Sequence, residues 1–342
     1  MARLTLTVTS EQLQLRQPFR ISGYLFEHFN VVVVKLSDGR FEGRGEGGGV
    51  YYLGDDAPHM LAELERARDT IEADPSRDEL RGLMPPGGAR NAVDCALWEL
   101  EAARHGMPVW QLAGQTAPRA LRTTFTLGAD EPLRMAQAAR ECAQARAIKV
   151  KLTGELELDL ARVASIRAAR PDVWLGVDGN QGFGADDLDA LVAGLSTYRV
   201  ALLEQPLARG QEAHLQGYRS AIPIAGDESI LTLDDVPSAL GRFDVVNIKL
   251  DKCGGLTEGL MMAAEARRLG LRVMVGNMGG SSLAMAPSFV LGQSCDIVDL
   301  DGPTFLANDR QPGVDYVHGN VWSSSAVWGA GVGIGVGARV MP

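Results

Sequence analysis

The sequence has few cysteines and histidines, and this scarcity excludes several kinds of site. Its 342 residues contain four cysteines, far apart and without a CxxC pair, and five histidines. No cysteine has a partner at the spacing of a zinc site, so a structural zinc is not expected. Widely spaced thiols are typical of proteins in a reducing compartment. We therefore expect free thiols and a cytoplasmic location.

The sequence also lacks an excess of positive charge and long apolar runs. Its formal net charge is −10, which opposes binding to nucleic acid or to an anionic membrane. No apolar run approaches the roughly 20 residues of a membrane-spanning helix. The first ten residues, MARLTLTVTS, lack the apolar region of a signal peptide and are expected to begin a strand. The composition therefore predicts a globular protein without nucleic acid or membrane partners.

The first third of the chain alternates between strand-like and helix-like patterns. Apolar residues at three- and four-residue spacing predict two helices, and the turn Ser37-Asp38-Gly39 predicts a hairpin. We expect an α+β domain over residues 1–115, with strands at 3–9, 31–36 and 40–46 and helices at about 56–73 and 89–104.

From about residue 120, short apolar runs recur at intervals of mostly 20 to 27 residues, separated by helical patterns. This alternation predicts βαβ units and a parallel sheet. Eight such strands favour a (β/α)₈ barrel over residues 116–302, although the spacing alone leaves an open doubly wound sheet possible. The strands are expected at 122–127, 147–152, 173–177, 200–203, 222–225, 244–249, 272–276 and 297–300. The glycine-rich segment 303–342 is expected to return to the N-terminal domain.

Three carboxylates stand at the ends of consecutive predicted strands: Asp178, Glu204 and Asp227. A single carboxylate after a strand often caps the following helix. Strand ends of a parallel barrel converge on one mouth, however, where three carboxylates repel each other unless a cation joins them. Oxygen ligands without histidine or cysteine favour magnesium. The sequence therefore predicts one Mg²⁺ at this mouth.

Lysines flank the predicted metal site. In AIKVKLTG, Lys149 and Lys151 point to one face of a strand because strand side chains alternate. Lys249 ends the sixth strand, four strands away, and therefore lies across the mouth from Lys151. Two lysines on opposite sides can remove a proton from an α-carbon on one face and return it on the other. Lys149 is expected to tune Lys151 and to contact the substrate carboxylate.

The segments KVK, DGN, LLEQPL, GDES and NIKLDKCGGLTE together resemble the enolase superfamily, and lysines on both sides resemble its muconate-lactonizing-enzyme-like subgroup. The resemblance covers essentially the whole chain. It implies a barrel with an α+β capping domain, one Mg²⁺ per subunit, and an enolate stabilised by that metal between Lys151 and Lys249. Large homo-oligomers are common in this superfamily.

Asp299 and Asp301, at the end of the eighth strand, resemble the Asp-x-Asp with which dipeptide epimerases hold the substrate's α-ammonium group. DLDGPTFLAND and GARNAVDCALWEL are similar to L-Ala-D/L-Glu epimerases. The resemblance thus implies epimerisation of the C-terminal residue of a dipeptide. Helix capping and turn formation before Gly302-Pro303 are the alternative role for the two aspartates. The alternative functions are an N-acylamino-acid racemase, an o-succinylbenzoate synthase and an inactive metal-binding homologue.

The segment PFRISGYLFEHFN departs from this resemblance. Epimerases that act on a C-terminal glutamate often have an arginine a few residues beyond the PF pair, where this chain has Gly23 and Tyr24. Arg20 comes too early. A more apolar second residue is therefore plausible. Tyr24 is predicted to bind substrate, and Phe26, Tyr51 and Tyr52 either line the same pocket or pack within the capping domain.

The run GRGEGG at 43–48 matches a dinucleotide-binding pattern by letter. It follows a hairpin strand and precedes no immediate helix, so the pattern lacks its structural context. We expect a mobile loop over the barrel mouth instead.

Overall fold

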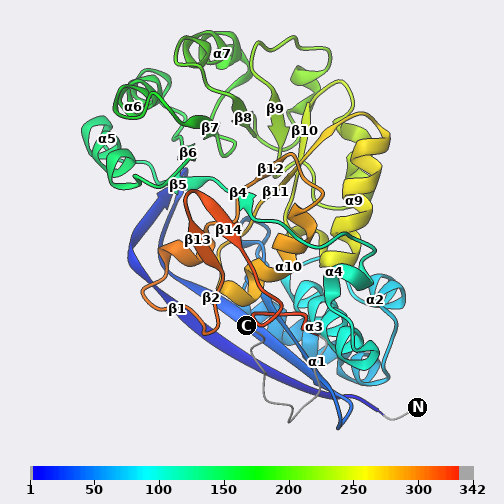
Figure 1. Ribbon diagram of the computed structural model, residues 1–342. Coiled ribbons are helices and arrows are strands. Elements are labelled where there is room, and N and C mark those ends of the chain that lie inside the picture. Colours follow the sequence, from blue (N-terminus) through cyan, green and yellow to red (C-terminus); the bar gives the residue numbers. More distant parts are fainter. Residues whose placement is uncertain (1–2, 331–342) are drawn as a thin grey trace.

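Eight parallel strands form a curled sheet in the computed structural model, which describes residues 3–330 (Figure 1). The strands pair in chain order from one edge of the sheet to the other. The two edges meet through a hydrogen bond from the Thr124 N–H to the Val298 carbonyl, 3.0 Å long. The barrel prediction is thus confirmed, with strands β5 (Phe125–Leu127), β6 (Ala147–Lys151), β7 (Trp174–Asp178), β8 (Leu202–Glu204), β9 (Ile224–Gly226), β10 (Val245–Ile248), β11 (Arg272–Val275) and β12 (Ile297–Val298).

Helices surround this sheet, but not after every strand (Figure 1). The α-helices are α5 (Pro132–Glu141), α6 (Leu156–Ala169), α7 (Leu188–Thr197), α8 (Leu250–Cys253), α9 (Leu256–Arg268) and α10 (Ser282–Gly292). The prediction of helices throughout is wrong after β8 and β9, where only 3₁₀ turns form, at Glu212–Leu215 and Leu233–Ala239. Pro237 lies inside the second turn and has no N–H for an α-helical hydrogen bond.

An antiparallel sheet of three strands, β1 (Thr5–Ile21), β2 (Tyr24–Ser37) and β3 (Glu42–Gly47), builds the N-terminal domain. β1 is longer than the strand predicted at 3–9. Pro18 lies in a register shift between Gln14 and Phe19, where a bulge tolerates proline, so the strand continues past it. The hairpin turns at Ser22-Gly23, and Gly23 has a φ of 74° that favours glycine.

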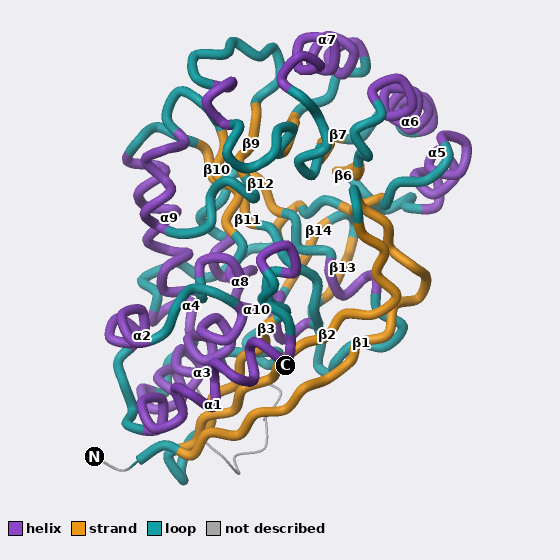
Figure 2. The backbone as a smooth tube through the Cα atoms, turned by 180° about the vertical axis from the view of Figure 1, so that it is seen from behind, coloured by secondary structure: helices purple, strands orange, loops and turns teal. Residues whose placement is uncertain are grey.

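The hairpin of β1 and β2 reaches from the N-terminal domain to the barrel. Figure 2 shows the two strands running from the side of α1 and α3 towards β6. Near the tip, the Arg20 carbonyl accepts a hydrogen bond from the N–H of Ala129, just after β5. The residues around the tip are therefore placed beside the barrel mouth.

The helices of the N-terminal domain are α1 (Ala57–Glu72), α2 (Arg77–Leu83) and α3 (Gly88–His105), followed by α4 (Val109–Leu112). Fifteen of the eighteen residues of α3 are buried, because the helix packs between β2 and β3 on one side and α8 and α9 on the other. A Cβ at Gly45 would lie 2.0 Å from the Ala92 carbonyl oxygen of α3. The mobile-loop prediction for GRGEGG is therefore wrong. Gly43 to Gly47 lie in β3, where the absence of side chains at the glycines allows α3 to pack closely.

The C-terminal segment contacts both parts of the molecule. β13 (Asp315–Val317) and β14 (Asn320–Trp322) form a small sheet with β4 (Leu121–Arg122). Towards the N-terminal domain, Arg310 pairs with Glu46 at 2.9 Å, and Trp328 donates to the Arg44 carbonyl. The predicted boundaries at 115 and 302 stay a prediction, and residues 331–342 of the last segment lie outside the described residues. Within residues 3–330, no helix combines the length and apolar character needed to cross a bilayer.

Candidate active site

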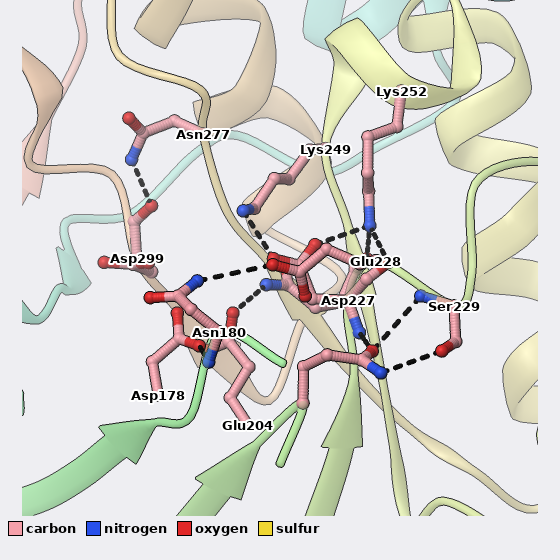
Figure 3. A network of polar contacts seen from close by, with 12 residues as sticks. Asp178, Asn180, Glu204, Asp227, Glu228, Ser229, Lys249, Lys252, Asn277 and Asp299 are labelled. Atoms are coloured by element: carbon pink, nitrogen blue, oxygen red, sulfur yellow. Dashed lines mark hydrogen bonds and ion pairs between the residues drawn. The ribbon is translucent and has the colours of Figure 1, made fainter. Parts of the chain in front are cut away.

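Three buried carboxylates lie together at the C-terminal edge of the barrel sheet. Asp178 ends β7 and pairs in register with Glu204, which ends β8, while Asp227 directly follows β9. One oxygen from each lies within 4.8 Å of the others, as a shared ion requires. Figure 3 shows Asp178, Glu204 and Asp227 beside one another. The structure therefore brings the three predicted metal ligands together.

The electrostatics of these carboxylates fit a cation. Burial and the neighbouring Asp178 carboxylate raise the pKa of Glu204 to about 8. Close by, the half-buried Asn180 amide donates to Glu228 at 3.3 Å, and the buried atoms Asn180 Oδ1 and Glu228 Oε2 have no partner among the described residues. An all-oxygen donor set with spare buried acceptors matches the preferences of Mg²⁺. The residues present could thus hold a magnesium ion.

Lys149 and Lys151 converge on the first of these carboxylates. Lys151 Nζ lies 2.6 Å from Asp178 Oδ2, and Lys149 Nζ lies 3.1 Å from the same atom. Lys149 also lies 2.7 Å from Glu204 Oε2. Burial disfavours the charge on Lys149, but its carboxylate neighbours outweigh burial and raise its pKa. Lys149 is therefore a fixed cation beside Lys151, and its tuning role stays a prediction.

Lys249 follows β10, on the other side of the carboxylates. Its Nζ lies 2.6 Å from Asp227 Oδ2. Burial lowers the pKa of Lys249, but the Asp227 carboxylate outweighs burial, so the net shift is upward. A Cβ at Gly276 would lie 3.0 Å from Lys249 Cε, so glycine at this position leaves room for the lysine stem.

Asp299 and Asp301 lie at the end of β12 and are buried. Asp299 Oδ2 is 2.9 Å from Lys149 Nζ, and its Oδ1 accepts a hydrogen bond from the Thr124 hydroxyl. Among the described residues, the Asp301 carboxylate accepts only from Thr126, whose N–H is 2.6 Å away. Burial and the Asp299 carboxylate raise the pKa of Asp301 to about 7. Asp301 is the member of the pair without a cationic partner among the described residues.

One cavity joins the lysines and the aspartate pair, and the buried carboxylates lie directly behind the lysines. Lys149, Lys151, Lys249, Asp299 and Asp301 all line it. Its opposite wall comes from the N-terminal domain and the C-terminal segment, through Phe19, Ile21, Phe26, Phe29, Tyr51 and Phe305.

Tyr24 does not line this cavity. Its side chain is 44% exposed and packs edge-on against Tyr51, with ring centroids 4.6 Å apart. Of the aromatic residues considered with it, Phe26 and Tyr51 line the cavity and Tyr52 does not. If the strands on both sides of the Ser22-Gly23 turn had been predicted, Tyr24 would have been recognised as the residue directly after that turn.

Three further residues support the site through contacts that were not predicted from the sequence. Lys252 Nζ lies 2.6 Å from Asp227 Oδ1, and Asn247 Nδ2 donates to Glu204 Oε1 at 2.9 Å. Asp251 accepts from the Gly48 N–H at 2.9 Å and so connects α8 to the loop that carries Tyr51. Lys252 was visible as a second lysine after β10, but the tight turn of α8 that buries it was not.

Two family models match the chain: "Mandelate racemase / muconate lactonizing enzyme, N-terminal domain" over residues 3–114, and "Enolase C-terminal domain-like" over residues 133–336. The chain is 37% identical to an L-Ala-D/L-Glu epimerase of Escherichia coli, over 93% of this chain and 99% of that protein. It is 39% identical to an N-acetyl-D-glutamate racemase of a Pseudoalteromonas species, over 73% and 79%.

Solved structures agree with this similarity. An enolase family member from Agrobacterium tumefaciens with homology to dipeptide epimerases, bound to sodium and L-Ala-L-Glu, is 38% identical with a TM-score of 0.90, covering 95% of this chain and 100% of that one. A dipeptide epimerase from Methylococcus capsulatus, complexed with Mg and L-Arg-D-Lys, is 28% identical with a TM-score of 0.88, covering 95% and 98%. The chain therefore belongs to the enolase superfamily, among the mandelate racemase/muconate lactonizing enzymes, as its motifs indicated.

Proposed function

We propose that this protein is a magnesium-dependent dipeptide epimerase, which inverts the α-carbon of the C-terminal residue. The observation that carries the proposal is the cavity itself. Its lysines contact the carboxylate cluster from two sides, and a pair of aspartates lines it as well. The similarity to an L-Ala-D/L-Glu epimerase over nearly the whole chain supports the same activity.

Asp178, Glu204 and Asp227 would hold the Mg²⁺. When bound, this ion supplies positive charge that stabilises the negative charge developing on the substrate carboxylate as the α-proton leaves. Lys252 and Asn247 keep Asp227 and Glu204 oriented, through contacts of 2.6 and 2.9 Å. The role of these three carboxylates follows from their geometry and chemistry together.

Lys151 and Lys249 are the two acid/base groups in the proposed reaction. They come from β6 and the end of β10, four strands apart in the barrel, and both reach the cavity. One lysine, in the neutral form that the charge of a bound Mg²⁺ would favour, takes the α-proton at Nζ, and the other, protonated, returns a proton to the opposite face. Lys149 stays charged between Asp178, Glu204 and Asp299 and is placed to orient the substrate carboxylate.

Asp299 and Asp301 would receive the substrate's α-ammonium group. Asp301 is buried and accepts one backbone hydrogen bond, so its second oxygen is available to a cationic ligand. A buried carboxylate without a cation is costly, and an ammonium group offsets that cost. This assignment favours a dipeptide over a substrate with an acylated nitrogen.

Incubation of an L,L-dipeptide library in deuterium oxide tests the proposal. We expect α-deuteration of the C-terminal residue, seen as a mass increase, with Mg²⁺ and not with EDTA. If the protein binds Mg²⁺ under the assay conditions but no dipeptide of the library exchanges, the epimerase function is overturned. That result would favour an inactive metal-binding homologue.

The rival function is racemisation of N-acylated amino acids, which the similarity to an N-acetyl-D-glutamate racemase supports. An o-succinylbenzoate synthase is a further member of this alternative. Such substrates carry no ammonium group, so Asp301→Asn would leave their turnover unchanged. Faster turnover of N-acetyl or N-succinyl amino acids than of any dipeptide would favour the rival. A cytoplasmic location and a homo-oligomeric state remain predictions from the sequence.

A further inference from the structure

The cationic groups of the cavity are already committed to carboxylates. Each of its three lysines has a carboxylate oxygen within 2.7 Å: Glu204 for Lys149, Asp178 for Lys151 and Asp227 for Lys249. No arginine or histidine lines the cavity among the residues that the structure describes. An anionic side chain of a substrate would therefore find no spare cation there.

The arginine nearest to the hairpin tip faces away from the cavity. Phe19 and Ile21 line the cavity, and strand residues alternate between faces, so Arg20 points to the other side. Arg20 is exposed and lines an outer groove that adjoins the cavity at Phe19 and Phe305, whereas the cavity itself does not include Arg20. At the turn, Gly23 carries no side chain. The hairpin therefore presents only apolar side chains to the substrate.

The aromatic residues of the cavity form two groups. Phe19 and Phe305 pack with ring centroids 4.7 Å apart, and Phe305 lies in the 3₁₀ turn Gly302–Phe305 directly after Asp301. This group is therefore placed beside the proposed ammonium site. The Phe19–Phe305 pair is therefore placed to contact the side chain of the dipeptide's first residue.

The second group lies towards Lys249. Tyr51, which is close enough to Lys249 and Asp227 to feel their charges, packs edge-on against Phe26 at 5.3 Å. Phe26 lies 6.0 Å from Phe29, whose ring occupies the space over Gly279, where a Cβ would be 2.9 Å from the ring. These three rings line the cavity together with Lys151 and Lys249, the two proposed acid/base groups.

We infer that the epimerised residue has an apolar side chain, which packs against Tyr51, Phe26 and Phe29. This inference rests on the proposed function and adds the substrate class. A glutamate carboxylate at this wall would lose its hydration without gaining a cationic partner. A methionine side chain of similar length buries apolar surface there instead, which is favourable.

Three dipeptides of matched size test the inference: L-Ala-L-Met, L-Ala-L-Gln and L-Ala-L-Glu. We expect kcat/KM for α-proton exchange to be at least tenfold higher for the methionine dipeptide than for the glutamate dipeptide, with glutamine between them. Equal or faster exchange of L-Ala-L-Glu would overturn the inference. Binding of the same dipeptides, measured by calorimetry with Mg²⁺ present, separates the two proposals. Preferential binding of the methionine dipeptide without any exchange would overturn only the proposed function.

A pair of variants on adjacent residues locates the effect. Phe26→Arg places a cation on the cavity wall, whereas Leu25→Arg places the same cation on the outer face of β2, where Leu25 is 50% exposed. We expect Phe26→Arg to shift the preference towards L-Ala-L-Glu at least tenfold and Leu25→Arg to leave it unchanged. The preference is a ratio within one enzyme, so a partial loss of folded protein does not alter it. An equal shift in both variants would contradict the placement of this subsite.

Discussion

Lys149 Nζ lies 2.9 Å from Asp299 Oδ2, and the same ammonium group contacts two of the three predicted metal ligands. One side chain thus joins the carboxylate cluster to the aspartate pair on β12. Asp299 and Asp301 differ in consequence. Asp299 is held by a lysine and a threonine hydroxyl, whereas the Asp301 carboxylate is contacted only by Thr126 among the residues that the structure describes.

This difference predicts unequal effects of Asp301→Asn and Asp299→Asn. Asp301→Asn removes the charge that faces the substrate ammonium, so we expect KM for dipeptides to rise at least tenfold with a smaller change in kcat. Asp299→Asn also removes a partner of Lys149, so kcat should fall as well. Steady-state kinetics of both variants give the comparison. Identical effects on KM and kcat in the two variants would contradict separate roles for the aspartates.

Substitution of each lysine tests the two-sided proton transfer. Lys151→Ala and Lys249→Ala should each reduce epimerisation at least a hundredfold, because general acid–base catalysis contributes about 10²–10⁴-fold and each epimer needs both groups. Each variant should retain deuterium exchange for only one stereoisomer of the dipeptide, and the two variants should retain opposite ones. Mass and chiral analysis in deuterium oxide separate exchange from inversion. Normal epimerisation by both variants would contradict the mechanism.

The sequence allowed the barrel, the strand order and the metal-site carboxylates to be predicted because these features depend on local patterns. Asp178, Glu204 and Asp227 each end a short apolar run, and parallel strands bring their ends to one edge. Lys149 and Lys151 needed only the alternation of side chains along β6. The structure places each of these residues at that edge.

Features that depend on contacts between distant segments were not predictable. The glycines of GRGEGG suggested a loop, but they allow the close approach of α3. That helix starts more than forty residues later, so the contact is not visible in the local pattern. The extent of β1 past Pro18 depends on its pairing with β2. Tyr24 and Phe26 lie on the same face of β2, but only the position of the turn shows that Phe26 lines the cavity while Tyr24 lies at the exposed tip.

Magnesium should stabilise the folded protein as well as support activity. A ligand at 100 times its Kd stabilises by about 2.7 kcal/mol, so a rise in the melting temperature with Mg²⁺ is expected. Glu204→Gln removes one ligand charge and should abolish most of that rise. Asp186→Asn, at an exposed carboxylate outside the cluster, is the matched control and should keep it. A Mg²⁺-dependent rise unaffected by Glu204→Gln would place the ion elsewhere.

Asp251 should act as a positioning residue for the cavity wall. It accepts hydrogen bonds from the Gly48 N–H and from the Asn91 amide, and so holds the segment that leads to Tyr51. Asp251→Ala should raise KM several-fold more than it lowers kcat, since Lys249 and the carboxylates stay in place. Asp251→Asn retains an acceptor oxygen and should recover part of the loss. If the two variants show the same fall in kcat and the same rise in KM, Asp251 acts on general stability instead.

Asp94 should make stability depend on pH between 4 and 6. Burial raises the pKa of its carboxyl from 3.8 to about 6, although Thr257 donates two hydrogen bonds to it. The folded state therefore holds the proton more strongly than the unfolded state, so this group stabilises the fold below pH 4 and loses that contribution as pH rises towards 6. A difference of roughly two pKa units corresponds to about 3 kcal/mol. Asp94→Asn should flatten denaturant-measured stability over this range, while Asp234→Asn, at an exposed position, should not. An unchanged slope in the Asp94 variant would show that other groups cause the pH dependence.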